Sequence, residues 1–159
     1  AGDARHAGEY YSKVRALAEG DDRIVFTGAL YGEEKEEAYR NAYLFCLPSD
    51  IEGLPIVLLE AMGAGLCCLT SDIPEVVEVI DPPRLGYANA DTTAAPSPHG
   101  ATFAQGNVAD LRAQLTQLIA QPERVAELGA NAQRHVEIEY TWDRIARQYA
   151  ETYQRALGR

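Results

Sequence analysis

The order of apolar and polar positions along the chain predicts alternating strands and helices. Three short apolar runs, at residues 23–28, 44–49 and 66–71, end in small or polar residues, as buried parallel strands do. Helical patterns precede and separate them, first at residues 9–18 and then at 33–41. This alternation is typical of an α/β fold, a Rossmann-like parallel sheet with helices on both faces.

The C-terminal part of the chain shows helical spacing throughout. Asn107 is expected to cap a helix whose apolar face includes Leu118, and Pro122 is expected to open a further helix with Leu128 turned inward. Thr141 is expected to cap the last helix, which carries an apolar and aromatic stripe along residues 142–157.

A helix is also predicted over residues 55–64, and it contains one residue that does not fit. Pro55 suits the first helical position and Gly65 supplies the stop. The residues between them are almost all apolar, which predicts a helix buried against a sheet. Glu60 is the exception. A carboxylate in that setting costs several kcal/mol unless it is paired, so it needs hydroxyl or cationic partners.

The segment before this helix predicts a ligand site. Gly53 and Leu54 have no side-chain oxygen to cap the first N–H groups of the helix, so these donors suit the oxygens of a ligand. In parallel sheets, ligands bind beyond the C-terminal ends of the strands, where Ser49 and residues 50–54 are expected. Two plainer interpretations stay open: Glu60 as a buried carboxylate held by backbone amides or an arginine, and Glu52 as a solvated loop residue.

Taken together, these residues resemble a known family. Pro48-Ser49, Glu52-Gly53-Leu54-Pro55, Leu59-Glu60-Ala61-Met62, Gly65 and Thr70-Ser71-Asp72-Ile73-Pro74-Glu75 are similar to the C-terminal, donor-binding domain of the retaining group 1, or family 4, glycosyltransferases of GT-B fold. Seven residues separate the two glutamates, as in the signature of that family. The likeness extends to residues 110–122, to a strand at 101–103 and to Tyr140-Thr141-Trp142, so it covers nearly the whole chain.

The resemblance implies roles for individual residues. Glu52 would lie near the donor sugar as the catalytic residue, and Glu60 would accept hydrogen bonds from ribose hydroxyls. Sugar or phosphate oxygens would meet the backbone at Gly53, Leu54, Pro55 and Ile56, although Pro55 has no N–H to give. Backbone groups of Gly28, Ala29 and Leu30 would contact the edge of the nucleobase.

The implied reaction is that of a retaining hexosyltransferase, which moves a sugar from a UDP- or GDP-linked donor to an acceptor hydroxyl in polysaccharide or glycolipid biosynthesis. In the picture favoured for the family, the leaving phosphate helps to deprotonate the acceptor, so no protein base is needed. The resemblance also implies that no metal or other cofactor takes part. Relatives grip the diphosphate with an Arg and a Lys that would fall upstream of residue 1. We therefore expect an inactive fragment, without the acceptor domain and the first strand, in which Arg5 or Lys13 is a candidate substitute cation.

Composition narrows the possible binding partners, location and domain organisation of the protein. A net charge of −10 and a pI near 4.7 argue against nucleic acid and against anionic lipid, so membrane contact would fall to the absent domain. Three cysteines in predicted strands favour reduced thiols and a cytoplasmic location. Residues 81–100 hold four of the eight prolines and predict a long loop or insertion within a single domain spanning residues 1–159. The alternatives to the transferase are a non-catalytic interaction or nucleotide-sugar-binding module and a GT-B-like epimerase.

Overall fold

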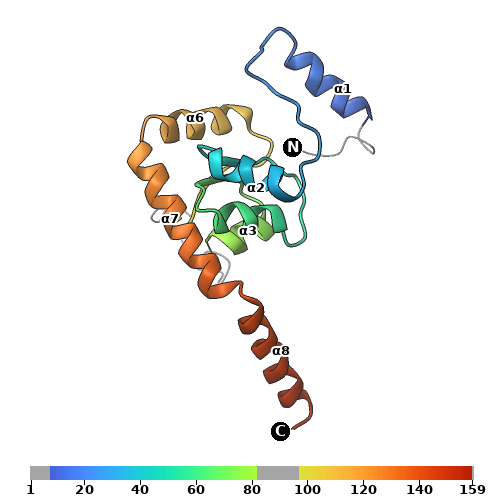
Figure 1. Cartoon of the computed structure of the whole chain (residues 1–159), viewed down its shortest axis with the longest axis vertical. Coiled ribbons are helices and arrows are strands. Elements are labelled where there is room, and N and C mark those ends of the chain that lie inside the picture. The colour runs from blue at the N-terminus through green and yellow to red at the C-terminus, as the bar shows by residue number, and fades with distance from the viewer. Residues whose placement is uncertain (1–7, 82–96, 159) are drawn as a thin grey trace. The chain divides into compact units, whose positions relative to one another are not determined.

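A computed structural model describes residues 8–81 and 97–158 of the chain (Figure 1). It divides into two compact units, Ala1–Asn41 and Ala42–Arg159. Most of the loop or insertion predicted over residues 81–100 lies outside the described residues.

The first unit holds two helices, α1 (Gly8–Leu17) and α2 (Gly32–Asn41), and neither has a buried residue. The strand predicted over residues 23–28 is wrong, because this segment is irregular. A strand needs a neighbour for its backbone N–H and C=O groups, and the described residues of this unit provide none. The segment is instead anchored at Phe26, whose ring meets that of Tyr11 edge-on at 6.0 Å and lies 5.0 Å beneath the Arg15 guanidinium.

The second unit contains the predicted parallel sheet, in the order β1 (Phe45–Leu47), β2 (Cys68–Ser71) and β3 (Ala101–Phe103). Cys46 pairs with Leu69, and Thr70 pairs with Thr102. The expected strands are confirmed, the first two with shorter bounds than the apolar runs. All three strands point the same way, so their C-terminal ends meet along one edge.

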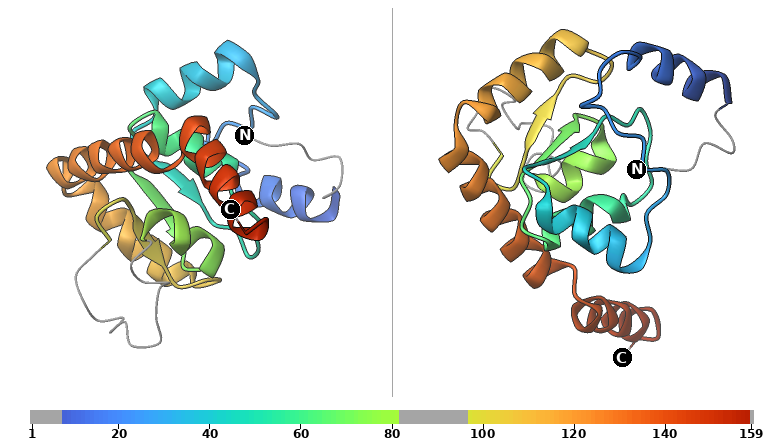
Figure 2. Two further views of the ribbon diagram at one scale, coloured as in Figure 1. Left: turned by 90° about the horizontal axis from the view of Figure 1, so that it is seen from below. Right: turned by 45° about the horizontal axis from the view of Figure 1, so that its top comes forward.

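Helices cover both faces of this sheet (Figure 2). The connections from β1 to β2 and from β2 to β3 run through α3 (Ile56–Gly63) and α4 (Pro74–Ile80), and the right-handed rule for such connections places both helices on one face. The other face packs against α6 (Val108–Ile119) and α7 (Pro122–Glu139). The core on that side consists of Cys67, Leu69, Phe103, Leu118, Val125 and Leu128. The class of fold expected from the sequence is confirmed.

Local chemistry sets the helix boundaries. The Asn107 side chain accepts from the Asp110 N–H at 3.0 Å, and that of Thr141 accepts from the Arg144 N–H at 3.3 Å, so both predicted caps are confirmed. Pro122 is the first residue of α7, also as expected. The turn after α3 has Gly65 in a left-handed conformation (φ 79°), and its N–H bonds the Met62 carbonyl.

The turn after α3 is also where α7 comes closest. A Cβ built on Gly129 would lie 2.1 Å from the Gly65 carbonyl oxygen, so only glycine fits at position 129. The backbone of α7 at Gly129 therefore packs directly against the backbone of the turn that follows α3.

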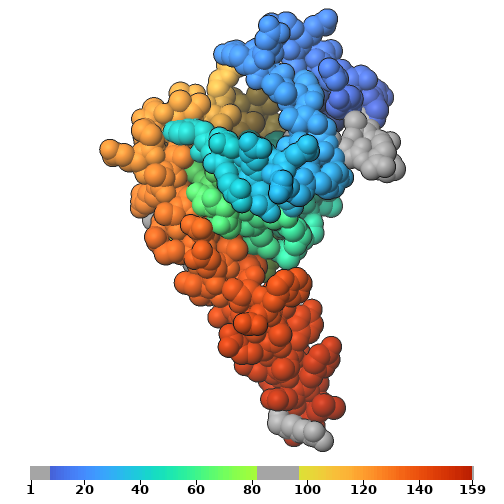
Figure 3. Space-filling view, in the orientation of Figure 1, coloured from blue at the N-terminus to red at the C-terminus, as the bar shows by residue number. Residues whose placement is uncertain are grey.

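The last helix, α8 (Trp142–Ala156), buries none of its residues. The side of α8 seen in Figure 3 is uncovered along its length. Trp142 is 84% exposed, and Tyr149, Tyr153 and Leu157 are exposed as well. The apolar and aromatic stripe along residues 142–157 therefore keeps uncovered side chains.

Candidate functional site

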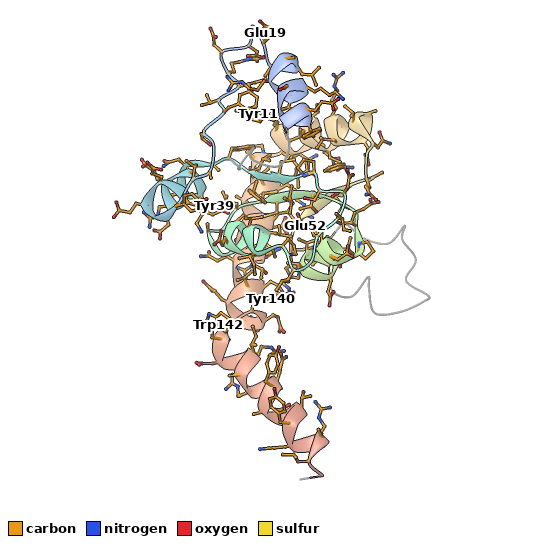
Figure 4. The ribbon with its side chains drawn as sticks, turned by 90° about the vertical axis from the view of Figure 1, so that its right-hand side faces the viewer. Tyr11, Glu19, Tyr39, Glu52, Tyr140 and Trp142 are labelled. Atoms are coloured by element: carbon orange, nitrogen blue, oxygen red, sulfur yellow. The ribbon has the colours of Figure 1, made fainter. Side chains whose placement is uncertain are left out.

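Serine hydroxyls organise the segment that follows β1. The Ser49 hydroxyl donates to a carboxylate oxygen of Glu52 at 2.6 Å, and both residues are half-buried. The Ser71 hydroxyl, at the end of β2, donates in turn to the Ser49 carbonyl. Glu52 is therefore a half-buried loop residue with one carboxylate oxygen held by a hydroxyl whose own backbone is fixed to the neighbouring strand. Figure 4 shows Glu52 in the loop between β1 and α3.

Gln105 ties the ends of all three strands together. Its backbone N–H donates to the Asp72 carboxylate at 2.8 Å, directly after β2. Its side-chain amide donates to the Asp50 carbonyl at 2.9 Å, in the loop after β1. The Asp72 N–H adds a bond to the Phe103 carbonyl at 3.0 Å. The sheet edge where ligands are expected is thus a connected network rather than three separate loops.

The start of α3 differs from the sequence prediction in two ways. Pro55 is the N-cap residue rather than the first helical residue, and its side chain makes no cap hydrogen bond. The helix is not buried on all sides, because Ile56 is 55% exposed and Val57 is 43% exposed. Three other apolar side chains, Leu58, Ala61 and Met62, are fully buried and fix the helix on the sheet. Apolar composition overstated burial here because half of the first turn faces away from the sheet.

The remaining predicted residues fall in different places. Glu60 lies one turn into α3, half-buried rather than enclosed, and it has an interaction partner. Gly53 and Leu54 are exposed in the loop before the helix. Gly53 and Leu54 thus lie in the same loop as Glu52, and Glu60 lies in the helix that this loop enters.

Gly28, Ala29 and Leu30 belong to the first unit. They lie between α1 and α2, and Gly28 has a φ of 72°. Of the two candidate cations, Lys13 forms an exposed ion pair with Glu9 at 2.9 Å on α1, whereas Arg5 is outside the described residues.

Sequence reasoning missed Gln105 as part of this edge. Its partners are 33 and 55 residues away, so local spacing offers no signal. The one usable hint is its position two residues after the strand at 101–103, at the same edge as Ser49 and Ser71. Within residues 8–81 and 97–158, no cluster of three or more His, Cys, Asp or Glu side chains could hold a metal ion.

The parallel sheet, its covering helices and its linked strand ends define a Rossmann-like α/β domain. The chain belongs to the family described as glycosyl transferases group 1, which it matches over residues 2–135.

Curated relatives agree with this assignment. The chain is 30% identical over 118 residues to the sulfoquinovosyl transferase SQD2 of Arabidopsis thaliana, covering 74% of this chain and 21% of that protein. It is 29% identical over 153 residues to the alpha-maltose-1-phosphate synthase of Mycolicibacterium smegmatis, covering 94% of this chain and 37% of that protein. The chain thus spans well under half the length of these relatives.

Solved structures show the same fold. A sucrose-phosphate synthase from Thermosynechococcus elongatus aligns with a TM-score of 0.73 at 20% identity, over 94% of this chain and 35% of that one. The Anabaena protein Alr3699/HepE, solved in complex with UDP and glucose, aligns with a TM-score of 0.73 at 18% identity, over 96% of this chain and 39% of that one. As to membranes, none of the helices in the described part of the chain combines the length and apolar character that crossing a bilayer requires.

Proposed function

We propose that this chain is the donor-binding domain of a retaining glycosyltransferase, which takes a hexose from a UDP- or GDP-linked donor. The observation that carries the proposal is the position of Glu52 and Glu60. Glu52 lies in the loop that follows β1, at the strand-end edge where α/β domains bind ligands, and Glu60 lies one turn into the helix that this loop enters. Family membership makes sugar transfer the reaction to which such a site contributes.

Each glutamate has a separate task in this proposal. The Glu60 carboxylate accepts hydrogen bonds from the two ribose hydroxyls, because a charged acceptor on a helix that is otherwise apolar suits paired O–H donors. Glu52, already held by the Ser49 hydroxyl, meets the donor sugar. The first turn of α3 and the backbone of Gly53 and Leu54 face sugar or phosphate oxygens, which the positive end of a helix favours.

The chemistry proposed for the whole enzyme is electrostatic. The main task is to stabilise negative charge on the departing diphosphate, and preorganised N–H donors act most strongly at that stage. The acidic balance of this chain makes such donors and cations more important, since carboxylates repel the diphosphate. No metal is required by this proposal, and the acceptor would be held by a partner domain.

Calorimetric titration of the chain with UDP and GDP tests the proposal. We expect one of the two to bind, and Glu60→Ala to weaken it about tenfold or more, as loss of hydrogen bonds to a charged group implies. Glu137→Ala removes an exposed glutamate of α7 and serves as the matched control. Failure of both nucleotides to bind, or equal affinity in Glu60→Ala and the unaltered chain, would contradict the proposal.

A further inference from the structure

We infer that Ser49 and Gln105 are positioning residues for Glu52. Neither is proposed to touch the reacting atoms. Ser49 fixes the carboxylate and Gln105 fixes the loop that carries it. The inference rests on the proposed donor-binding function and adds to it the parts of the chain that hold its catalytic carboxylate in place.

The Ser49 contact acts directly on the side chain of Glu52. At 2.6 Å, a hydroxyl donating to a carboxylate is a short, charge-assisted hydrogen bond, about twice as strong as one between neutral groups. This hydrogen bond occupies one of the two carboxylate oxygens of Glu52 and selects one rotamer of its side chain. The Ser71 hydroxyl bonds the Ser49 carbonyl from β2, so the donor is itself anchored to the sheet.

The Gln105 contacts act on the backbone of the loop. The Asp50 carbonyl, two residues before Glu52, accepts from the Gln105 amide at 2.9 Å, and the Asp50 carboxylate lies 3.4 Å from the same nitrogen. The Gln105 backbone is fixed in turn by the Asp72 carboxylate. The loop is already tied to the sheet through β1 and, at Ser49, through β2, and these contacts add an attachment to the end of β3.

The same contacts also order the charges at this edge. Asp50 and Asp72 both accept hydrogen bonds from Gln105, and Glu52 accepts from Ser49. Each carboxylate therefore has a defined donor. A nucleotide sugar carries two phosphate charges, so a carboxylate free to swing toward them would oppose binding. Precise placement within about 0.5 Å is what a binding carboxylate needs from its supporting residues.

The test compares two ligands that differ in the group Glu52 is proposed to meet. Ser49→Ala and Gln105→Ala are titrated with UDP-glucose and with UDP, and with GDP-mannose and GDP. We expect the Kd of the nucleotide sugar to rise about fivefold, the effect of one lost hydrogen bond, while the Kd of the nucleoside diphosphate stays within twofold. Ser49→Thr keeps the hydroxyl and should restore the affinity of the unaltered chain. Gln148→Ala, an exposed glutamine of α8, is the matched control.

Hydrogen exchange gives a second measurement that needs no ligand. We expect the amides of residues 50–54 to exchange faster in Ser49→Ala and Gln105→Ala, with exchange in β2 and α7 unchanged. If the unaltered chain binds none of the four ligands, the proposed function fails, while the exchange rates still decide whether these residues hold the loop. The inference would be overturned if the variants bound the nucleotide sugar and the nucleoside diphosphate with equally weakened affinity. Unchanged amide exchange at residues 50–54 would also overturn it.

Discussion

The imidazole rings of His99 and His135 stack with their centroids 4.3 Å apart and their planes 18° from parallel. His99 Nδ1 donates to the Ile80 carbonyl at 3.2 Å, and the ring of Tyr140 meets His135 edge-on. The pair therefore joins the segment before β3 to α7 and to the end of α4. A positive charge on both rings would be unfavourable at this distance, because like charges repel.

This stack predicts acid sensitivity of folding. Burial, followed by the nearby His99, lowers the pKa of His135, while Glu139 and the Val79 backbone act in the opposite direction. A lowered pKa in the folded state means that stability is complete above the unfolded value of about 6.5 and decreases as the pH falls through the folded value. We expect the midpoint of urea unfolding to fall between pH 7 and pH 5 by less in His135→Phe than in the unaltered chain. If the urea midpoints of His135→Phe and of the unaltered chain changed with pH in parallel, this prediction would be contradicted.

Two glycines predict opposite effects of the same substitution. Gly129→Ala should destabilise the chain by about 3 kcal/mol or more, because the added Cβ would lie 2.1 Å from the Gly65 carbonyl oxygen. Gly63→Ala in α3 is the control, since its Cβ would meet only Val136 at an ordinary 3.8 Å. Alanine is the better helix former, so this change should stabilise by about 0.5 kcal/mol. Urea unfolding measures both, and effects of the same sign would refute the packing described for α7.

The N-terminus of α6 predicts a capping effect. Asn107→Ala removes the acceptor of the Asp110 N–H and should cost about 1 kcal/mol of unfolding free energy. Asn107→Asp keeps a side-chain oxygen in the same place and should be close to neutral. Thermal or urea unfolding measures the stability of the two variants. An equal loss of unfolding free energy in both would show that the cap contributes little.

The cysteines predict selective thiol reactivity. Burial raises the pKa of the Cys67 thiol to about 11, and burial followed by Cys67 raises the pKa of Cys68 further. At pH 8, about one Cys67 in a thousand is therefore a thiolate, the form that reacts. We expect a maleimide to leave both residues unmodified in the folded chain and to modify them in urea, with Cys46, which is half-buried, reacting first. Mass spectrometry after timed quenching follows each site, and rapid native modification of Cys68 would contradict its burial.

Features governed by neighbouring residues could be predicted from the sequence. Asn107, Pro122 and Thr141 begin helices where their own side chains or ring dictate. The strand at residues 101–103, which the family resemblance implied, also has the expected bounds. The positions of Glu52 and Glu60 relative to β1 and α3 follow from the same local logic.

Features that depend on partners far away in the sequence could not be predicted. Residues 23–28 have the composition of a strand, but a strand exists only beside another one. The helix predicted over residues 9–18 leaves Tyr10 71% and Leu17 87% exposed, because burial requires a surface to pack on. Gln105 was not predicted, because its hydrogen-bond partners lie tens of residues away in the sequence and such contacts leave no periodic pattern.

The exposed start of α8 has a practical consequence. Trp142 is the sole tryptophan of the chain, so its fluorescence reports on this helix and on no other part of the fold. Figure 4 shows it beside Tyr140, where α7 gives way to α8. A solvated indole emits at long wavelength, and any protein surface that comes to rest on this helix would shift the emission to the blue. The molecule thus carries an intrinsic optical reporter for whatever covers its C-terminal helix.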